Sequence, residues 1–259
     1  MLVVGDSCTD VYVYGAVDRL SPEAPIPVFV LKRELMFPGM AGNVAANMRG
    51  LDDDVTLCAS EAAATKTRYV DERSRQQLIR VDDELETVAM TSAQLDEIEI
   101  EMADFDALVI VDYDKGFVDS RSISRLCSYA HSSSVPVYVD TKRTCSTSYT
   151  GCIVKLNSRE RLYVKLGDEC ELVTTLGEGG AEWNGIVFPG KRVDVFDVAG
   201  AGDTFLSAFV HAHLCTGDVA ASIAFANECA AIAISHQGTY ALKQSDVDPL
   251  LDDIDGWEM

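Results

Sequence analysis

DVAGAGDTF, residues Asp197–Phe205, decides the fold and leads directly into the apolar segment FLSAFVHAHL. The stretch places Gly200, Gly202 and the carboxylate of Asp203 ahead of a predicted helix. A Gly-rich turn that enters a helix N-terminus presents backbone N–H groups and the positive end of the helix dipole, which together bind phosphate. A carboxylate beside that anion is electrostatically unfavourable unless it acts on a substrate. Removing a proton from an attacking hydroxyl is a role that such a carboxylate can take. The alternative is that Asp203 complements the helix dipole and the glycines only form a turn.

Outside this stretch the chain alternates apolar strands with helical segments, which is typical of an α/β sheet. Several predicted strands are continuous apolar runs, as expected for parallel strands covered on both faces. Ligands of such sheets bind beyond the carboxyl ends of the strands. The predicted strands are Leu2–Gly5, Val55–Cys58, Ala107–Asp112, Val135–Asp140, Cys152–Leu156 and Glu171–Thr175. The predicted helices are Gly42–Gly50, Ser120–Ser132, Ala201–Cys215 and Asp218–His236.

Composition agrees with an enzyme whose single domain buries a large core, at 259 residues and 47% hydrophobic content. The longest apolar helix, near Ala220–Ser235, is interrupted by Asn227 and Glu228, so we expect no membrane partner. No charged and apolar leader precedes the first strand, and we expect a cytoplasmic protein. The eight cysteines show neither a CxxC pair nor a zinc-like spacing, which predicts reduced, mostly buried thiols.

The charge balance excludes one class of partner, because 42 acidic against 21 basic residues give a formal net charge of −21. That field opposes nucleic-acid binding through phosphates. Basic residues nevertheless gather in the segment Lys66–Arg80, as Lys66, Arg68, Arg73, Arg75 and Arg80. An exposed hairpin with solvated charges is the bland interpretation of that segment. If the substrate carries a phosphate, a second interpretation is favoured, in which Lys66, Arg68 or Arg80 contacts that distal phosphate.

Four motifs in order along the chain resemble those of the PfkB or ribokinase-like family of carbohydrate kinases. They are PGMAGNVAANMRGL (Pro38–Leu51), KLNSRE (Lys155–Glu160), VTTLGEGG (Val173–Gly180) and the Gly-Ala-Gly-Asp segment Gly200–Asp203. Met40 stands where the family usually has a glycine. The resemblance implies a ribokinase-like α/β fold over residues 1–259, with a mostly parallel central sheet flanked by helices. It also implies a small β-sheet lid with strands from about residues 11–31 and 65–82.

The resemblance further implies an ATP-dependent phosphotransferase that uses Mg²⁺, with Asp203 as the general base. The implied anion hole consists of the backbone N–H groups of Gly200, Ala201 and Gly202. Sugar contacts are implied for Asp10, Gly39, Asn43 and Asp112, besides the lid cations named above. Nucleotide contacts are implied for Asn157, Glu160, Thr175, Gly177, Gly180 and Asn227, of which Asn157 and Glu160 would hold Mg²⁺ through water. Asp197 and Ala199 resemble positions that coordinate a monovalent cation such as K⁺. Local structural roles are the alternative for Asp10, Asn43 and Asn227.

The N-terminal segment Val3–Phe29, with Ser-Pro-Glu-Ala-Pro at Ser21–Pro25, is similar to the start of bacterial heptose-7-phosphate kinases. TKTRYVDERSRQQLIRVDDE (Thr65–Glu84) and VDYDKGF (Val111–Phe117) also resemble that subgroup. The subgroup transfers the γ-phosphate of ATP to the anomeric hydroxyl of D-glycero-D-manno-heptose 7-phosphate. A kinase of another sugar, sugar phosphate or nucleoside is the nearest alternative.

The chain is short for the resembled family, with no room between Ala59 and Thr65 for the usual strand and helix. There is also little room for a helix between Glu160 and Glu171. A catalytically silent sugar-binding protein is therefore the alternative from another class. The lid of the resembled family often pairs subunits, so we expect a homodimer.

Overall fold

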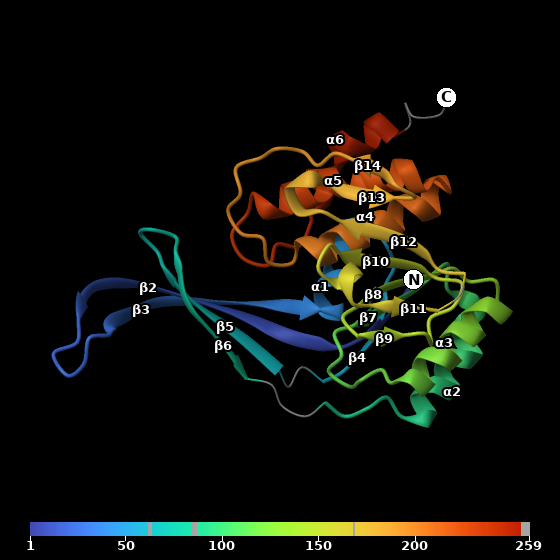
Figure 1. Ribbon diagram of the computed structural model, residues 1–259, viewed down its shortest axis with the longest axis horizontal. Helices are drawn as coiled ribbons and strands as arrows, with labels where there is room; N and C mark the ends of the chain where they lie inside the picture. Colours follow the sequence, from blue (N-terminus) through green and yellow to red (C-terminus); the bar gives the residue numbers. More distant parts are fainter. Residues whose placement is uncertain (62–63, 84–86, 168, 255–259) are drawn as a thin grey trace.

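In the computed structural model, which describes residues 1–61, 64–83, 87–167 and 169–254, eight strands form one central sheet (Figure 1). Their order is β14-β13-β12-β10-β8-β7-β1-β4, and the six strands from β12 to β4 run parallel. β13 and β14 extend the sheet as antiparallel strands. This confirms the predicted mostly parallel sheet. The bounds are β1 Leu2–Gly5, β4 Thr56–Ala59, β7 Leu108–Asp112, β8 Val137–Thr141, β10 Ile153–Asn157, β12 Glu171–Thr175, β13 Ala181–Trp183 and β14 Ile186–Phe188.

Helices cover both faces of this sheet, because successive strand residues point to opposite sides and both sides are apolar. On one face Val3 and Val109 pack into a core with α1 (Ala41–Gly50), α4 (Ala201–Thr216) and α5 (Val219–Ile234). On the other, Leu2 and Ile110 pack with α2 (Ser92–Glu101) and α3 (Ser120–Ser132). The two layers therefore fix α4, with the Gly-Ala-Gly-Asp stretch at its start, against the sheet.

The acidic C-terminal segment docks on the first of these cores as α6 (Gln244–Ile254). Val247 is fully buried there, and Leu250 packs against the same core. Leu251, Ile254 and Trp257 are the other apolar residues that could dock this segment, and their side chains lie outside the described part of the chain. Among the described residues, none of the helices has the length and apolarity that crossing a bilayer requires.

A second sheet of four strands, in the order β3-β2-β5-β6, runs out from the α/β body (Figure 1). Its strands are β2 Ser7–Leu20, β3 Pro27–Met40, β5 Ala64–Asp71 and β6 Gln77–Asp83. This separate sheet is the predicted lid, although β2 begins earlier and β3 ends later than expected. Because β3 continues to Met40 and α1 begins at Ala41, the lid joins the body directly at the first helix.

Met40 occupies the junction in a backbone conformation that normally belongs to glycine, with φ 55° and ψ −128°. Positive φ costs a residue with a side chain about 1–3 kcal/mol. The side chain of Met40 is buried in the core beside α1, which offsets part of that strain. The backbone path of the family's usual glycine is therefore compatible with methionine here.

β4 is the outer strand of the sheet at the place where the sequence predicts missing peripheral elements. Leu57, in the middle of β4, is 36% exposed. A groove of about 420 Å³ runs between Leu57, the start of β2 and the outer side of α1. In the second short region, between Glu160 and Glu171, the described residues form a single 3-10 turn, Glu160–Leu162, and the short strand β11 (Lys165–Leu166), which pairs with β9 (Cys145–Ser146).

Candidate active site

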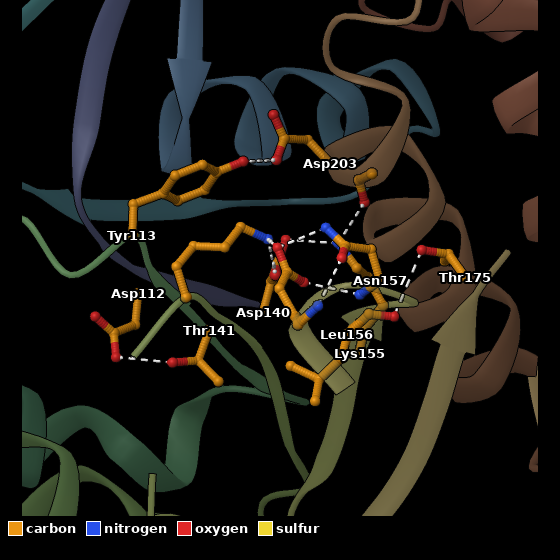
Figure 2. A network of polar contacts seen from close by, with 12 residues as sticks. Asp112, Tyr113, Asp140, Thr141, Lys155, Leu156, Asn157, Thr175 and Asp203 are labelled. Atoms are coloured by element: carbon orange, nitrogen blue, oxygen red, sulfur yellow. Dashed lines mark hydrogen bonds and ion pairs between the residues drawn. The ribbon is translucent and has the colours of Figure 1, made fainter. Parts of the chain in front are cut away.

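Asp203 lies in the first turn of α4, and its carboxylate is held from both sides. Oδ2 accepts a hydrogen bond of 2.9 Å from Nδ2 of Asn43 in α1. Oδ1 accepts one of 2.9 Å from the hydroxyl of Tyr113 (Figure 2). The residue is 5% exposed. Burial raises the pKa of Asp203, and the Asn43 donor opposes that shift. A buried carboxylate with a raised pKa and a fixed orientation suits proton abstraction.

Gly200 ends the turn before α4 in the left-handed region, with φ 80°. A Cβ at this position would lie 2.8 Å from Nδ2 of Asn43 and 2.8 Å from Cγ2 of Thr239. Gly200, Ala201 and Gly202 lie at the start of α4, where the first N–H groups of a helix lack partners within the helix, and this is the turn that was predicted to bind an anion.

Asn43, which was predicted as a sugar contact, makes its side-chain hydrogen bonds within the chain. It is fully buried, its Nδ2 donates to Asp203, and its Oδ1 accepts a hydrogen bond of 3.0 Å from Asn47. Because its amide is occupied within the chain, Asn43 orients the carboxylate of Asp203. Its position in the first turn of α1 nevertheless brings the Pro38–Leu51 motif to the Gly200–Asp203 motif.

A chain of buried charges runs beneath this turn at the carboxyl ends of β8 and β10 (Figure 2). Nζ of Lys155 lies 2.6 Å from Oδ2 of Asp140 and 3.4 Å from the carbonyl oxygen of Gly202. Lys142 lies 2.8 Å from the other oxygen of Asp140 and 2.7 Å from Oε1 of Glu160. Burial raises the pKa of Asp140, but Lys155 and Lys142 outweigh it and lower that pKa overall. The two lysines and the two carboxylates therefore neutralise one another within the folded chain.

Asn157 and Glu160 contact each other at the end of β10, as their spacing predicts. Glu160 accepts hydrogen bonds of 2.8 Å from the Asn157 backbone N–H and 2.6 Å from its Nδ2. Within the described residues, no group of three or more His, Cys, Asp or Glu side chains could enclose a metal ion. With Lys142 also on Glu160, this donor set fits Mg²⁺ held through water and nucleotide phosphates rather than by direct ligation.

The residues that were predicted to contact the nucleotide differ in the space around them. Thr175 ends β12, and Gly177 follows with φ 62° and open space around its Cα. At Gly180, with φ 87°, a Cβ would lie 2.1 Å from the carbonyl oxygen of Phe188, so only glycine fits. Asn227 donates from Nδ2 to that same carbonyl oxygen at 3.1 Å. Gly180 and Asn227 therefore fix the backbone that follows β14. Gly177, by contrast, has open space where a side chain would lie.

The lid brings three of the predicted sugar residues together near the base. Asp10 in β2 is buried and forms an ion pair of 2.5 Å with Arg68 in β5. Thr239 donates to the second Asp10 oxygen at 3.3 Å. A Cβ on Gly39 would lie 2.6 Å from Asp10, so this glycine permits the close approach of β3 to β2.

The two other lid cations lie in different surroundings. Nζ of Lys66 is 5.3 Å from the centroid of the Tyr113 ring, whose hydroxyl contacts Asp203. Arg80 lies opposite Arg68 in β6, but its side chain is half exposed and pairs with Asp82 at 2.8 Å. The structure therefore brings Lys66, and not Arg80, into contact with the site.

Asp112 was predicted among the sugar contacts, and in the structure its side chain makes its hydrogen bonds within the chain. Its side chain is fully buried at the end of β7 and turns toward Thr141, away from Asp203 (Figure 2). Arg143 donates to both of its oxygens, at 3.0 and 3.2 Å, and Tyr149 donates at 3.0 Å. With its acceptors occupied, Asp112 fixes the loops after β7 and β8. Asp197, a predicted cation ligand, accepts a hydrogen bond of 2.9 Å from the N–H of Ala199.

The part of the chain that carries this site resembles a known family of proteins. Residues 154–246 match the model of the pfkB family carbohydrate kinases. Over these residues the chain is similar to the pfkB family. The matched segment includes the Asn157–Glu160 pair, the Gly200–Gly202 turn and Asp203, and it agrees with the resemblance of the three motifs that lie within it.

Curated relatives extend the similarity over nearly the whole pfkB-like chain. Bifunctional protein HldE of Azorhizobium caulinodans is 31% identical over 302 residues, covering 95% of this chain and 63% of that protein. Bifunctional protein HldE of Citrifermentans bemidjiense is 28% identical over 301 residues, with 95% and 62% covered. The chain thus spans less than two thirds of the length of these relatives. The alignments are longer than the 259-residue chain, so the relatives carry residues that it lacks within the matched region.

Solved structures share the fold. Phosphofructokinase-2 from Escherichia coli in complex with potassium has a TM-score of 0.71 at 16% identity, with 98% of this chain and 99% of that chain covered. Ribokinase from Arabidopsis thaliana complexed with ribose and ATP has a TM-score of 0.69 at 17% identity, with 96% and 97% covered. These likenesses confirm the ribokinase-like fold.

Four polar residues of this site were not predicted from the sequence, namely Tyr113, Asp140, Lys142 and Lys155. Tyr113 and Lys155 lie within the quoted VDYDKGF and KLNSRE segments, yet neither type marks a site by itself. Asp140 ends the predicted strand Val135–Asp140 and Lys142 follows it, and the rule that ligands bind at carboxyl strand ends could have selected both. A lysine inside an otherwise apolar strand was the available signal for Lys155.

Proposed function

We propose that this pfkB-family protein is an ATP-dependent sugar kinase whose acceptor is the anomeric hydroxyl of a heptose 7-phosphate. The observation that carries the proposal is the buried carboxylate of Asp203, oriented by two donors at the anion-binding start of α4. The heptose rests on the similarity of Val3–Phe29 to heptose-7-phosphate kinases and on the cations of the lid. The HldE relatives support the same subgroup by their similarity over 95% of the chain.

In the proposed reaction Asp203 removes the proton of the sugar hydroxyl as its oxygen attacks the γ-phosphorus. The new O–P bond forms while the bond from that phosphorus to the bridging oxygen of ATP breaks, and ADP leaves with the electron pair. The raised pKa of Asp203 strengthens it as a base, and its two donors hold the carboxylate in place. Backbone N–H groups of Gly200–Gly202 stabilise the charge on the transferring group.

Lys155 supports this turn from below through the Gly202 carbonyl and adds positive charge beneath the anion site. Asn157 and Glu160 would hold Mg²⁺ through water, and the metal, when bound, neutralises charge on the nucleotide phosphates. Thr175 and Gly177 line the nucleotide beyond β12, and Asp197 with Ala199 provides the site for a monovalent cation. Replacing K⁺ by a large organic cation in the assay tests the last assignment, since equal rates contradict it.

Lys66 and Arg68 contact the distal phosphate of the sugar, and Asp10 with Gly39 orients its hydroxyls. Lys66→Met should raise KM for the sugar phosphate with little change in KM for ATP. Arg80→Met is the matched control, because Arg80 lies on the same lid but pairs with Asp82 at a half-exposed position. Equal effects of the two variants on both KM values would contradict the assignment.

The lid also pairs two copies of the chain in this proposal. Apolar side chains stand exposed along its strands, as Val30, Leu31, Met36, Leu78, Ile79 and Val81. Exposed apolar side chains fit a self-complementary interface between two copies. Ile79→Glu should shift the protein from dimer to monomer in analytical ultracentrifugation. A concentration-independent monomer in the unmodified protein would refute the pairing.

The first test is ATP consumption with Mg²⁺ across heptose 7-phosphates, hexose phosphates, free sugars and nucleosides, with Asp203→Asn as control. Turnover confined to a heptose 7-phosphate, and reduced roughly 10²–10⁴-fold in the variant, supports the proposal. Turnover of another acceptor keeps the kinase and refutes the heptose. Sugar binding without turnover by the unmodified protein favours the non-catalytic alternative.

A further inference from the structure

Tyr113 is placed by the end of β7 so that its hydroxyl meets the catalytic carboxylate. Its backbone N–H donates to Oδ2 of the fully buried Asp6 at 2.9 Å, and the N–H of Phe117 donates to the other Asp6 oxygen at 3.1 Å. Asp6 thereby fixes the loop that carries Tyr113. The tyrosine hydroxyl donates to Oδ1 of Asp203 at 2.9 Å (Figure 2).

The ring of Tyr113 also lies near two cations, one from the lid and one from the residues after β8. Nζ of Lys66, on the lid, is 5.3 Å from the ring centroid, and Nζ of Lys142, after β8, is 5.1 Å from it. Attraction between a cation and an aromatic face restrains both partners. One side chain therefore contacts the lid, the base and the charge chain that reaches Glu160.

An ionised carboxylate offers about four lone-pair sites on its two oxygens. Asn43 and Tyr113 each take one of these sites, on different oxygens, so the carboxylate plane is fixed and acceptor capacity is left for a substrate hydroxyl. Asn43 alone would leave the carboxylate free to turn about its Cβ–Cγ bond. The second anchor on Oδ1 removes that freedom.

We propose that Tyr113 is a positioning residue for phosphoryl transfer, whose hydroxyl fixes the carboxylate of Asp203 toward the acceptor hydroxyl. The inference rests on the proposed kinase function and deepens it. Tyr113 remains a donor throughout, because burial and the Asp203 charge raise its own pKa well above the ordinary range. Its donated hydrogen bond also favours the ionised form of Asp203.

Other charged and titratable groups near Asp203 also influence its pKa. Asp140 raises its pKa and Lys155 lowers it. The thiol of Cys8, on β2, is near enough for its own pKa to be raised by Asp203, and Lys66 on β5 lowers that thiol pKa. None of these side chains is altered when the Tyr113 hydroxyl is removed, so a change in the titration of Asp203 reports that hydroxyl.

The test compares Tyr113→Phe with Tyr138→Phe. Both variants keep the ring, and Tyr138 donates or accepts at His213 near the other end of α4, at 2.7 Å. Tyr113→Phe should lower kcat roughly tenfold with KM for the sugar unchanged, because an anchor on a charged group is lost. The acid limb of its kcat–pH profile should move to higher pH, since the base loses a donor that stabilises its ionised form. Tyr138→Phe should show neither change.

A second readout does not need turnover. Carbon-13 NMR titration of the Asp203 carboxyl should give a higher pKa in Tyr113→Phe than in the unmodified protein and Tyr138→Phe. In the unmodified protein the Tyr113 hydroxyl proton should exchange slowly, and Asp203→Ala should abolish that protection, which keeps the contact testable if Tyr113→Phe does not fold. An unchanged Asp203 titration, or a lowered KM with unchanged kcat, would overturn the inference. Absence of turnover by the unmodified protein refutes the kinase proposal separately, whatever the titration shows.

Discussion

Gly200→Ala and Gly217→Ala together measure what the glycine at the anion-binding turn contributes. Both glycines flank α4 in the left-handed region, Gly200 before it with φ 80° and Gly217 after it with φ 66°. A Cβ on Gly217 meets nothing within 4 Å. A Cβ on Gly200 would lie 2.8 Å from Asn43 Nδ2 and from Thr239 Cγ2. The two variants therefore share the backbone strain and differ in the steric contact.

The shared strain is about 1–2 kcal/mol, and the reduced freedom of the unfolded chain offsets about 0.4–1 kcal/mol of it. Gly217→Ala should thus lower the free energy of unfolding by about 1 kcal/mol. In Gly200→Ala the Asn43 amide must also move, because normal contacts need about 3.5 Å. That movement breaks its bond to a charged carboxylate, which contributes about 1.5–3 kcal/mol. Gly200→Ala should therefore cost about 3 kcal/mol in total.

Urea unfolding at neutral pH measures both values, and the corresponding Tm losses are about 2–4 °C for Gly217→Ala and about 6–12 °C for Gly200→Ala. Since Asn43 orients Asp203, Gly200→Ala should also lose most of kcat, whereas Gly217→Ala should keep it. Equal stability losses in the two variants would refute the steric argument. A fully active Gly200→Ala enzyme would refute the link from the turn through Asn43 to the base.

Lys155→Met should cost about 3 kcal/mol of stability in urea unfolding, because buried Asp140 then keeps only its second lysine partner; an unchanged midpoint contradicts this. Burial raises the pKa of the Cys8 thiol to about 12, so at pH 8 Ellman's reagent should react quickly with exposed Cys145 and slowly with Cys8 in the folded protein. Equal rates would show that Cys8 is accessible. Burial raises the pKa of Asp203 above 3.8, so its contribution to stability is present at lower pH and lost as pH rises through the raised value. The stability of Asp203→Asn relative to the unmodified protein should therefore increase with pH above 3.8, and a constant difference would contradict the shift. Because the net charge is −21, added NaCl should raise Tm, and a falling Tm would show that local ion pairs dominate.

Much of the sheet and its helices could be predicted, because local signals agree with the tertiary structure there. Leu2–Gly5, Glu171–Thr175 and Ser120–Ser132 have the same bounds in sequence and structure. α2 was missed, since IEIE at residues 98–101 alternates like a strand; its capping box at Thr91 and Gln94 was the overlooked signal. β13 and β14 are three residues each, too short for a periodic pattern.

By itself the sequence determined the alternation of strands and helices, the Gly-rich start of α4 and the carboxylate at residue 203. These features depend on neighbours along the chain, through hydrophobic period, glycine at positive φ and helix capping. Only the tertiary structure decided the partners of each charge. Asp112 pairs with Arg143, and Asn43 donates a hydrogen bond to Asp203. Tyr113 reaches the same carboxylate from the end of another strand. Hydrogen bonds and ion pairs act over a few ångströms in space, so residues 90 or 160 positions apart become partners only when the sheet and α4 bring them together.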